Sequence, residues 1–116
     1  MSEHIRVRSV IGRFLEHHRI LYFRNNGADD VYLSSADWMG RNLFRRIEVA
    51  WPIIDSKLKA RVINEGLKPY IDDTCDAWIL DADGQYHTVR SGGRAGSVGA
   101  QRRLLEKLAA SESVLA

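Results

Sequence analysis

Residues 14–24 read FLEHHRILYFR, and they decide how the neighbouring chain can fold. Residues 18–24 are rich in aromatic and aliphatic side chains, which predicts a β-strand. Side chains on a strand point alternately to its two faces, so His17 and His18 should point apart, and His17 should share a face with Arg19. The stretch therefore predicts that one of the two histidines, together with the arginine, faces a functional site.

Two more strands are expected close to this one. NNGADD, residues 25–30, has the composition of a turn. VYLSSA, residues 31–36, alternates apolar and polar side chains and predicts the partner strand. RRIEVAWPI, residues 45–53, predicts a third strand that Pro52 closes.

The second half of the chain combines helices with a hairpin. Asp55 is suited to cap a helix, which Gly66 and Pro69 should end or kink. Residues 76–90 predict a hairpin around Ala-Asp-Gly, and residues 90–99 come closest to a linker. A closing amphipathic helix should follow, with its apolar face formed by Val98, Leu104, Leu105 and Leu108.

These elements define a mixed α/β fold class, an α+β-type sheet with hairpins. We expect about five strands and about two main helices in a single domain over residues 1–116. Residues 9–17 could form a short helix or an irregular turn.

Length and composition restrict the class of protein. With 116 residues, of which 45% are hydrophobic, the chain is long enough for one domain and too short for two. It contains neither a transmembrane run nor a signal-peptide core, which predicts a cytoplasmic location, at most peripheral to a membrane. A single cysteine, Cys75, excludes a disulfide within the chain. The three tryptophans, Trp38, Trp51 and Trp78, are expected in the core.

Positive charge is concentrated in arginines. Most of the 17 basic residues are arginine, and residues 1–46 contain arginines and no lysine. The guanidinium fork is suited to phosphate oxygens. Candidates to line a polyanion channel, with a solvated basic edge as the alternative, are Arg41, Arg45 and Arg46.

His17 and Arg19 form a candidate phosphate site with two serines. If the first two strands pair, Ser34 and Ser35 lie near the basic end of the first strand. An imidazole can act as nucleophile or acid/base, a cation neutralises phosphate charge, and hydroxyls orient its oxygens. The spacing is similar to the phospholipase D signature, with Arg19 in place of lysine and residues 34–37 in place of Gly-Ser-x-Asn. A structural ion pair for Arg19 and plain turn hydroxyls for the serines are the alternatives.

Longer stretches resemble one family. VRSVIGRFLEHHRILYFRNNG, VYLSSADWMGRNL and RRIEVAWPI together resemble the C-terminal end of bacterial polyphosphate kinase, and the likeness continues through LKARV, AWILDADGQY and AQRRLLEKL. The resemblance covers nearly the whole chain and implies a phospholipase D-like half domain, the C-terminal part of the last catalytic domain of the kinase. It also implies that His17 matches an essential histidine of the FLEH-x-R motif and that His18 is incidental.

The activity implied by the resemblance is reversible transfer of the ATP γ-phosphate to inorganic polyphosphate through a phosphohistidine in a preceding domain. ATP is then a substrate, and magnesium is implied for the parent enzyme, with no ligands identified in these residues. The implied partners are polyphosphate and the remaining domains of the kinase, with a homo-oligomer left open and no specific nucleic acid. The chain is expected to be an excised C-terminal fragment rather than a freestanding short gene. Such a fragment should be inactive alone and expose an apolar face where the rest of the kinase would pack.

Two other functions stay open at this stage. One is a homodimeric phospholipase D-like phosphodiesterase, in which each of two His-x-Arg halves supplies one histidine. The other is a non-catalytic module that binds polyphosphate or RNA.

Overall fold

The computed structural model describes residues 3–89 and 98–112 of the chain, so most of the expected linker, 90–99, lies outside the described residues. The chain divides into two compact units. We call Glu16–Leu67 the central unit, and we call Met1–Leu15 together with Lys68–Ala116 the terminal unit. Each is described by itself, and the expectation of a single domain over the whole chain stays a prediction.

The central unit is built on an antiparallel sheet of the order β2-β3-β4. Its strands are β2 (Ile20–Phe23), β3 (Asp30–Ser34) and β4 (Ala50–Pro52). The turn between the first two contains η1 (Asn25–Gly27), where Asn25, Asn26 and Gly27 all have positive φ. Such angles suit asparagine and glycine, which explains the composition of this turn. The predicted strand pair and its turn are therefore confirmed.

The predicted third strand is shorter than expected. Residues 45–53 were expected to be extended throughout, but pairing with β3 is limited to Ala50–Pro52. Residues before it form the helix α1 (Gly40–Arg45), whose first turn is closed by the Met39 carbonyl, which accepts hydrogen bonds from the Asn42 and Leu43 amides. The expectation was too long at its start, because Arg45 belongs to α1 and residues 46–49 form an irregular connection between that helix and β4.

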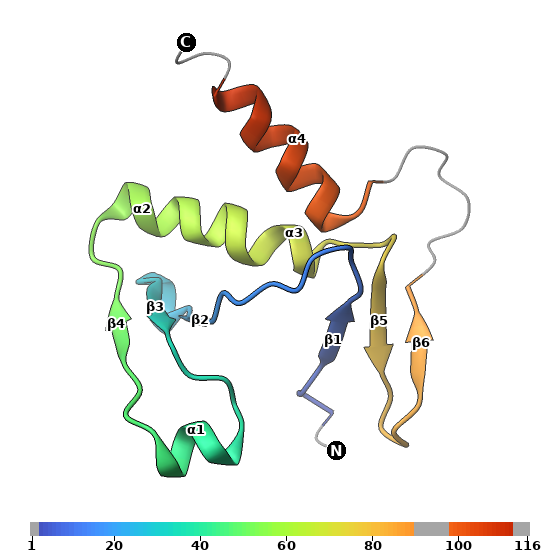
Figure 1. The fold of residues 1–116 in the computed structure, drawn as a ribbon, viewed down its shortest axis with the longest axis horizontal. Helices are drawn as coiled ribbons and strands as arrows, with labels where there is room; N and C mark the ends of the chain where they lie inside the picture. Colours follow the sequence, from blue (N-terminus) through green and yellow to red (C-terminus); the bar gives the residue numbers. More distant parts are fainter. Residues whose placement is uncertain (1–2, 90–97, 113–116) are drawn as a thin grey trace. The chain divides into compact units, whose positions relative to one another are not determined.

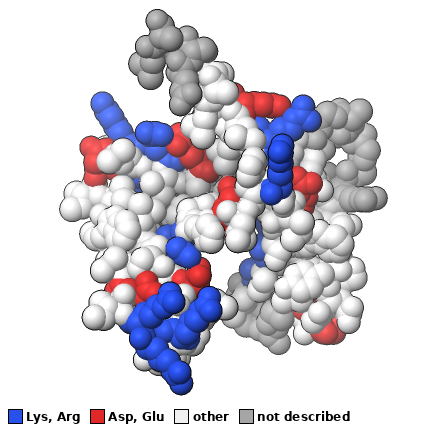
Figure 2. All heavy atoms as spheres, in the orientation of Figure 1, with Lys and Arg blue, Asp and Glu red and all other residues white. Residues whose placement is uncertain are grey.

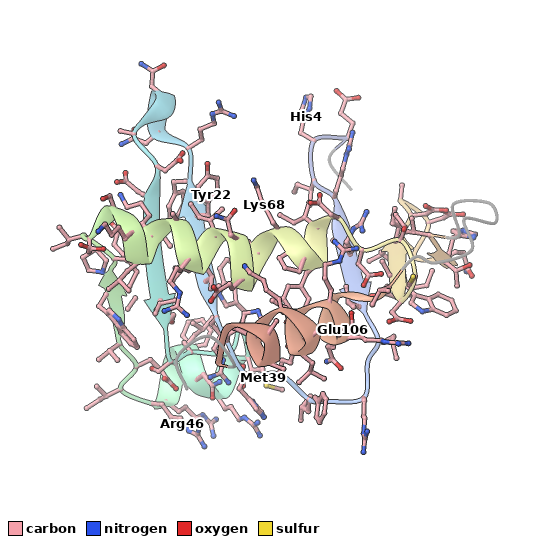
Figure 3. All side chains as sticks on the ribbon, turned by 90° about the horizontal axis from the view of Figure 1, so that it is seen from above. His4, Tyr22, Met39, Arg46, Lys68 and Glu106 are labelled. Carbon is pink, nitrogen blue, oxygen red and sulfur yellow. The ribbon has the colours of Figure 1, made fainter. Side chains whose placement is uncertain are left out.

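A helical segment follows β4, and the part of it that belongs to the central unit lies across the strands of the sheet (Figures 1 and 3). It begins with α2 (Ser56–Arg61), and the Asp55 carboxylate caps it by accepting a 2.8 Å hydrogen bond from the Leu58 amide. The segment continues as the π-helical η2 (Val62–Leu67) and then α3 (Lys68–Ile71). The helix thus continues through Gly66 and Pro69 as far as Ile71, and the irregularity expected at these residues takes the form of the π turn.

The terminal unit contains a second antiparallel sheet, in the order β1-β5-β6. Its strands are β1 (Val7–Val10), β5 (Ala77–Leu80) and β6 (Tyr86–Thr88). The hairpin of β5 and β6 turns at Gly84, which has a φ of 84°, as its sequence predicted. The helix α4 (Ala100–Glu112) confirms the predicted closing helix, although Val98 lies before its first residue, and it packs against α3. β1 was not predicted.

Few large apolar side chains are buried in the described residues. The buried hydrophobic residues are Val31, Ala36, Ala77 and Ala100. Trp38 is 82% exposed, Trp51 45% and Trp78 37%, so the expectation of tryptophans in the core is wrong. Each of these side chains lies on a face that the described residues leave uncovered. The expected exposed apolar surface is present, and in the central unit its most exposed members are Trp38, Phe44, Ile47 and Ile54.

Within residues 3–89 and 98–112, no helix has both the length and the apolar character needed to cross a membrane.

Candidate functional site

His17 lies directly before β2, in the segment that leads into the strand. Its side chain is exposed, and within the described part of the chain it takes part in no hydrogen bond or ion pair. An exposed imidazole of this kind is accessible to a substrate, and its ring nitrogens are available for proton transfer. The position therefore suits the role that the family resemblance implies for His17.

His18 has a partner in the fold. Its Nε2 atom lies 3.1 Å from the carbonyl oxygen of Gly66, in η2. A carbonyl oxygen can only accept a hydrogen bond, so Nε2 must carry the proton and donate it. The two adjacent histidines thus differ in that one is held by the backbone of the central unit and the other is not.

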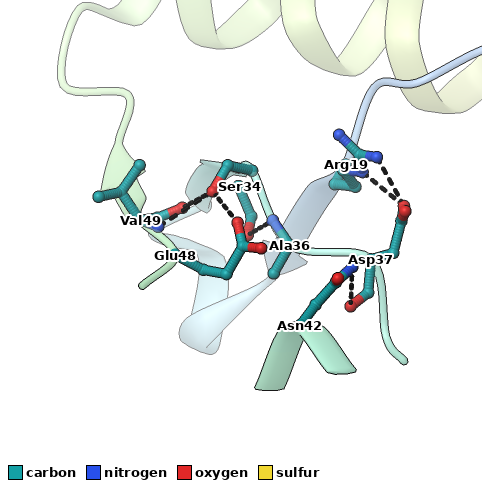
Figure 4. Close-up of polar contacts among 8 residues, drawn as sticks. Arg19, Ser34, Ala36, Asp37, Asn42, Glu48 and Val49 are labelled. Carbon is teal, nitrogen blue, oxygen red and sulfur yellow. Dashed lines mark hydrogen bonds and ion pairs between the residues drawn. The ribbon is translucent and has the colours of Figure 1, made fainter. Parts of the chain in front are cut away.

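Arg19 is engaged by Asp37 (Figure 4). Its Nε and Nη2 atoms each lie 2.7 Å from the Asp37 Oδ1 atom. The Arg19 carbonyl accepts a 2.9 Å hydrogen bond from the Ser34 amide, which extends the β2–β3 pairing by one residue. The structural ion pair considered for Arg19 is thus present, and its guanidinium still has N–H groups that could bind a phosphate.

The two serines lie at the end of β3, close to Arg19 as the strand pairing predicted. The Ser34 hydroxyl accepts a 3.1 Å hydrogen bond from the Ala36 amide. The Ser35 hydroxyl donates to the Glu48 carboxylate and accepts a 3.1 Å hydrogen bond from the Val49 amide. Both hydroxyls therefore stabilise local turns, and Ser34 retains its own O–H for a further acceptor.

Asn42 is a neighbour of the site that the sequence reasoning did not identify, whereas Asp37 was part of the stretch matched to Gly-Ser-x-Asn. Asn42 is 3% exposed, and its Nδ2 atom donates a 3.3 Å hydrogen bond to the Asp37 carbonyl (Figure 4). Asn42 thereby fixes the residue that holds the Arg19 guanidinium. The signal available in the sequence was a polar residue between Arg41 and Leu43, which by itself does not indicate burial.

The candidate arginines gather around α1. Arg41, Arg45 and Arg46 are exposed, and none of them makes an ion pair within the residues described. Figure 2 shows the resulting basic patch at the lower left, over α1, and Figure 3 shows the Arg46 side chain directed outward. Other arginines are neutralised locally, as Arg61 is by Glu65 and Arg102 by Glu106. The α1 patch thus has the free positive charge that attracts polyanions.

The segment that leads to His17 is held in the terminal unit by the side chain of Gln101. Its Oε1 atom accepts a 3.0 Å hydrogen bond from the Phe14 amide, and its Nε2 atom donates a 2.7 Å hydrogen bond to the Phe14 carbonyl. A Cβ atom on Gly12 would overlap the Gln101 side-chain amide, so a larger residue here would have to displace that amide from its two hydrogen bonds with Phe14. The three residues line a small pocket at the start of α4.

Two side chains of the central unit have perturbed proton affinity. The hydrogen bond that Tyr22 donates to the Asp29 carboxylate raises the pKa of the tyrosine. The hydrogen bond and charge of Glu65 raise the pKa of Arg61. Both effects keep these groups protonated near neutral pH, so neither tyrosine nor arginine is prepared here as a base.

A magnesium site has no ligand set in the part of the chain that the structure describes. No group of three or more histidine, cysteine, aspartate or glutamate side chains gathers there in a way that could hold a metal ion. The acidic residues near the candidate site are used otherwise, since Asp37 binds Arg19 and Glu48 binds Ser35.

Comparison with known proteins gives consistent matches. The family model described as polyphosphate kinase C-terminal domain 2 matches residues 1–101. A curated polyphosphate kinase of Burkholderia lata is 64% identical over 92 residues, which make up 79% of this chain and 13% of that protein. One of Paraburkholderia phytofirmans is 55% identical over 107 residues, or 92% of this chain and 15% of that protein.

A solved structure matches as well. The crystal structure of polyphosphate kinase from Porphyromonas gingivalis has a TM-score of 0.84 and 34% sequence identity, over 97% of this chain and 17% of that one. The chain therefore spans only a small share of the length of the relatives that it matches.

Proposed function

The chain belongs to the family of polyphosphate kinase C-terminal domains, and from this premise we propose that it is the part of such a kinase that presents His17 to a phosphate. The whole enzyme would transfer the γ-phosphoryl group of ATP reversibly to the end of inorganic polyphosphate. The phosphohistidine that carries the group would belong to residues of the kinase outside these 116.

The observation that carries this proposal is the contrast among residues 17–19. His18 and Arg19 are bound by Gly66 and Asp37, whereas the exposed His17 imidazole has no partner among the described residues. A histidine whose neighbours are fixed and whose own ring is free is suited to act on a substrate. The resemblance to the FLEH-x-R motif supports the same assignment, because it implies that His17 corresponds to an essential histidine.

In this proposal His17 forms no covalent bond to phosphorus. In phosphoryl transfer the bond from the γ-phosphorus to the leaving oxygen breaks while a bond to the acceptor forms, and charge accumulates on oxygen. A protonated imidazole can donate to that oxygen and a neutral one can accept a proton from the attacking group. We assign His17 to one of these roles, or to donation of a hydrogen bond to the phosphate, and Arg19 to neutralising the phosphate charge.

The α1 patch supplies the second part of the proposal. Polyphosphate is a flexible polyanion, and exposed arginines without local acidic partners attract and hold it. Arg41, Arg45 and Arg46 are therefore assigned to binding the chain of phosphates, and Ser34 to orienting one of its oxygens. Magnesium would neutralise phosphate charge when bound in the full enzyme, and no step here is assigned to a metal ligand of this chain.

Assays of the 116-residue chain and of the full kinase test the proposal together. The full kinase should form polyphosphate from ATP, and the chain alone should bind polyphosphate without making it. Polyphosphate formation is measured by acid-insoluble phosphate, and binding by titration at several salt concentrations.

Two other results would replace the proposal. Cleavage of a phosphodiester substrate by the chain alone, in the presence of EDTA, would favour the homodimeric phosphodiesterase. A full-length protein that binds polyphosphate but never turns over ATP would favour a non-catalytic polyanion module.

A further inference from the structure

We propose that His18 and Gly66 are positioning residues for His17, although the family motif makes His18 incidental. The inference rests on the proposed function of His17 and adds to it the groups that direct its side chain. The hydrogen bond from the His18 Nε2 atom to the Gly66 carbonyl joins the His17 segment to the π-helical η2.

The first support is that two residues of the segment face the same glycine. The His18 ring donates to the Gly66 carbonyl, and a Cβ atom on residue 66 would overlap the Ile20 Cδ1 atom and lie 3.9 Å from the His18 Cδ2 atom. Residues 18 and 20 therefore point to one side, as alternation on an extended chain requires. Arg19, between them, is directed instead to Asp37. By the same alternation, His17 projects on the side of Arg19.

The second support is the form of the helix at this point. Val62–Leu67 is π-helical, and such turns are rare and costly, so they persist where they serve a purpose. Gly66 lies within this wide turn, its missing side chain lets Ile20 pack closely, and its carbonyl accepts the hydrogen bond from His18. A side chain at residue 66 would have to displace the Ile20 Cδ1 atom.

The third support is that the other side of the segment is fixed independently. The Arg19 carbonyl is paired with the Ser34 amide, and the Arg19 side chain is paired with Asp37. With residues 18, 19 and 20 all anchored, the Cα–Cβ direction of His17 is set by the fold before any substrate arrives. Preorganisation of this kind raises the rate of a step without adding a contact to the substrate.

The test uses histidine variants of the full kinase. His18→Ala removes the donor and should lower kcat for polyphosphate synthesis about five- to tenfold, the factor expected for loss of one hydrogen bond. His18→Gln keeps an N–H donor of similar reach and should restore most of the activity. His87→Ala, which removes an exposed imidazole paired with Asp81, is the matched control and should leave kcat unchanged.

Glycine variants test the same contact from the helix side. Gly66→Ala should also lower kcat, because the added methyl pushes on Ile20. The double variant Gly66→Ala with Ile20→Val removes the overlapping Cδ1 atom and should recover activity. KM for ATP and the melting temperature should stay near their original values in the histidine variants. A purely structural defect would instead lower the melting temperature.

The outcomes separate this inference from the proposed function. Loss of activity in His17→Ala, with unchanged kcat in both His18→Ala and Gly66→Ala, overturns the positioning role and leaves the role of His17 intact. Normal activity in a folded His17→Ala kinase overturns both. A fall in kcat for His18→Ala that His18→Gln does not recover also contradicts the inference, because the hydrogen bond would not be the cause.

Discussion

Asp73, in the described part of the terminal unit, is a buried polar residue that accepts several hydrogen bonds. It is fully buried, and its Oδ1 atom accepts hydrogen bonds of 2.8 Å from the Cys75 amide and 2.7 Å from the Asp76 amide. Its Oδ2 atom accepts a 2.6 Å hydrogen bond from the Ala100 amide at the start of α4, and its carbonyl accepts one from Arg8. One carboxylate thus ties α4 to the turn before β5.

Asp73→Ala should lower the free energy of unfolding by about 2–4 kcal/mol, because three amides lose a charged acceptor and the helix loses its cap. Asp73→Asn should cost less, since the amide oxygen keeps part of the pattern. Urea unfolding of the 116-residue chain followed by circular dichroism measures both. Asp83→Ala, at an exposed position, is the control, and an equal loss there would contradict the assignment.

At the scale of single residues, the sequence could predict in which direction a side chain points, but not which group it binds. Alternation separates His17 from His18, and the contacts of residues 18–20 follow that rule. The Gly66 carbonyl lies 48 residues away from His18 in the chain. Every residue type has a backbone carbonyl, so the sequence does not indicate which one accepts this hydrogen bond. The burial of Asp73 was hidden for the same reason, because its partners are backbone amides.

At the scale of elements, local patterns predicted what local forces determine. The β2–β3 pair, the Asp55 cap and the β5–β6 hairpin are encoded in turn residues and alternation. β1 was missed because Arg8 and Ser9 separate its two valines and hide any alternation, and because its partner, β5, is distant in the chain. The π-helical η2 was missed because no propensity encodes it, and Gly66 and Pro69 are read as breakers from sequence alone.

The α1 patch makes a prediction at this scale. Arg45→Gln together with Arg46→Gln should weaken polyphosphate binding by the 116-residue chain and reduce its dependence on salt, because two unpaired positive charges are removed. The control is Arg61→Gln together with Arg102→Gln, which removes the same charge from arginines already paired with Glu65 and Glu106. Polyphosphate affinity is measured by binding titration at low and high salt. An equal loss of affinity in the two double variants would show that net charge alone determines binding.

At the scale of the whole molecule, composition predicted an ordinary core, and the described residues do not have one. The chain is 45% hydrophobic, yet Phe44, Ile47 and Ile54 are at least 85% exposed. The sequence shows how many apolar residues the chain has. It does not show which of them are covered by other parts of a longer protein. We expect the rest of the kinase to cover this surface, since the chain spans only 13% to 15% of its curated relatives.

The central claim is that His17 acts on phosphate while its neighbours hold it in place, and a single substitution tests it. His17→Ala in the full kinase should lower the rate of ATP-dependent polyphosphate synthesis by at least ~10²-fold, the effect typical of losing an acid/base group. Its circular dichroism spectrum and melting temperature should match those of the unmodified kinase, because the exposed ring makes no hydrogen bond or ion pair within the described residues. A folded His17→Ala kinase that synthesises polyphosphate at a near-normal rate would contradict the account.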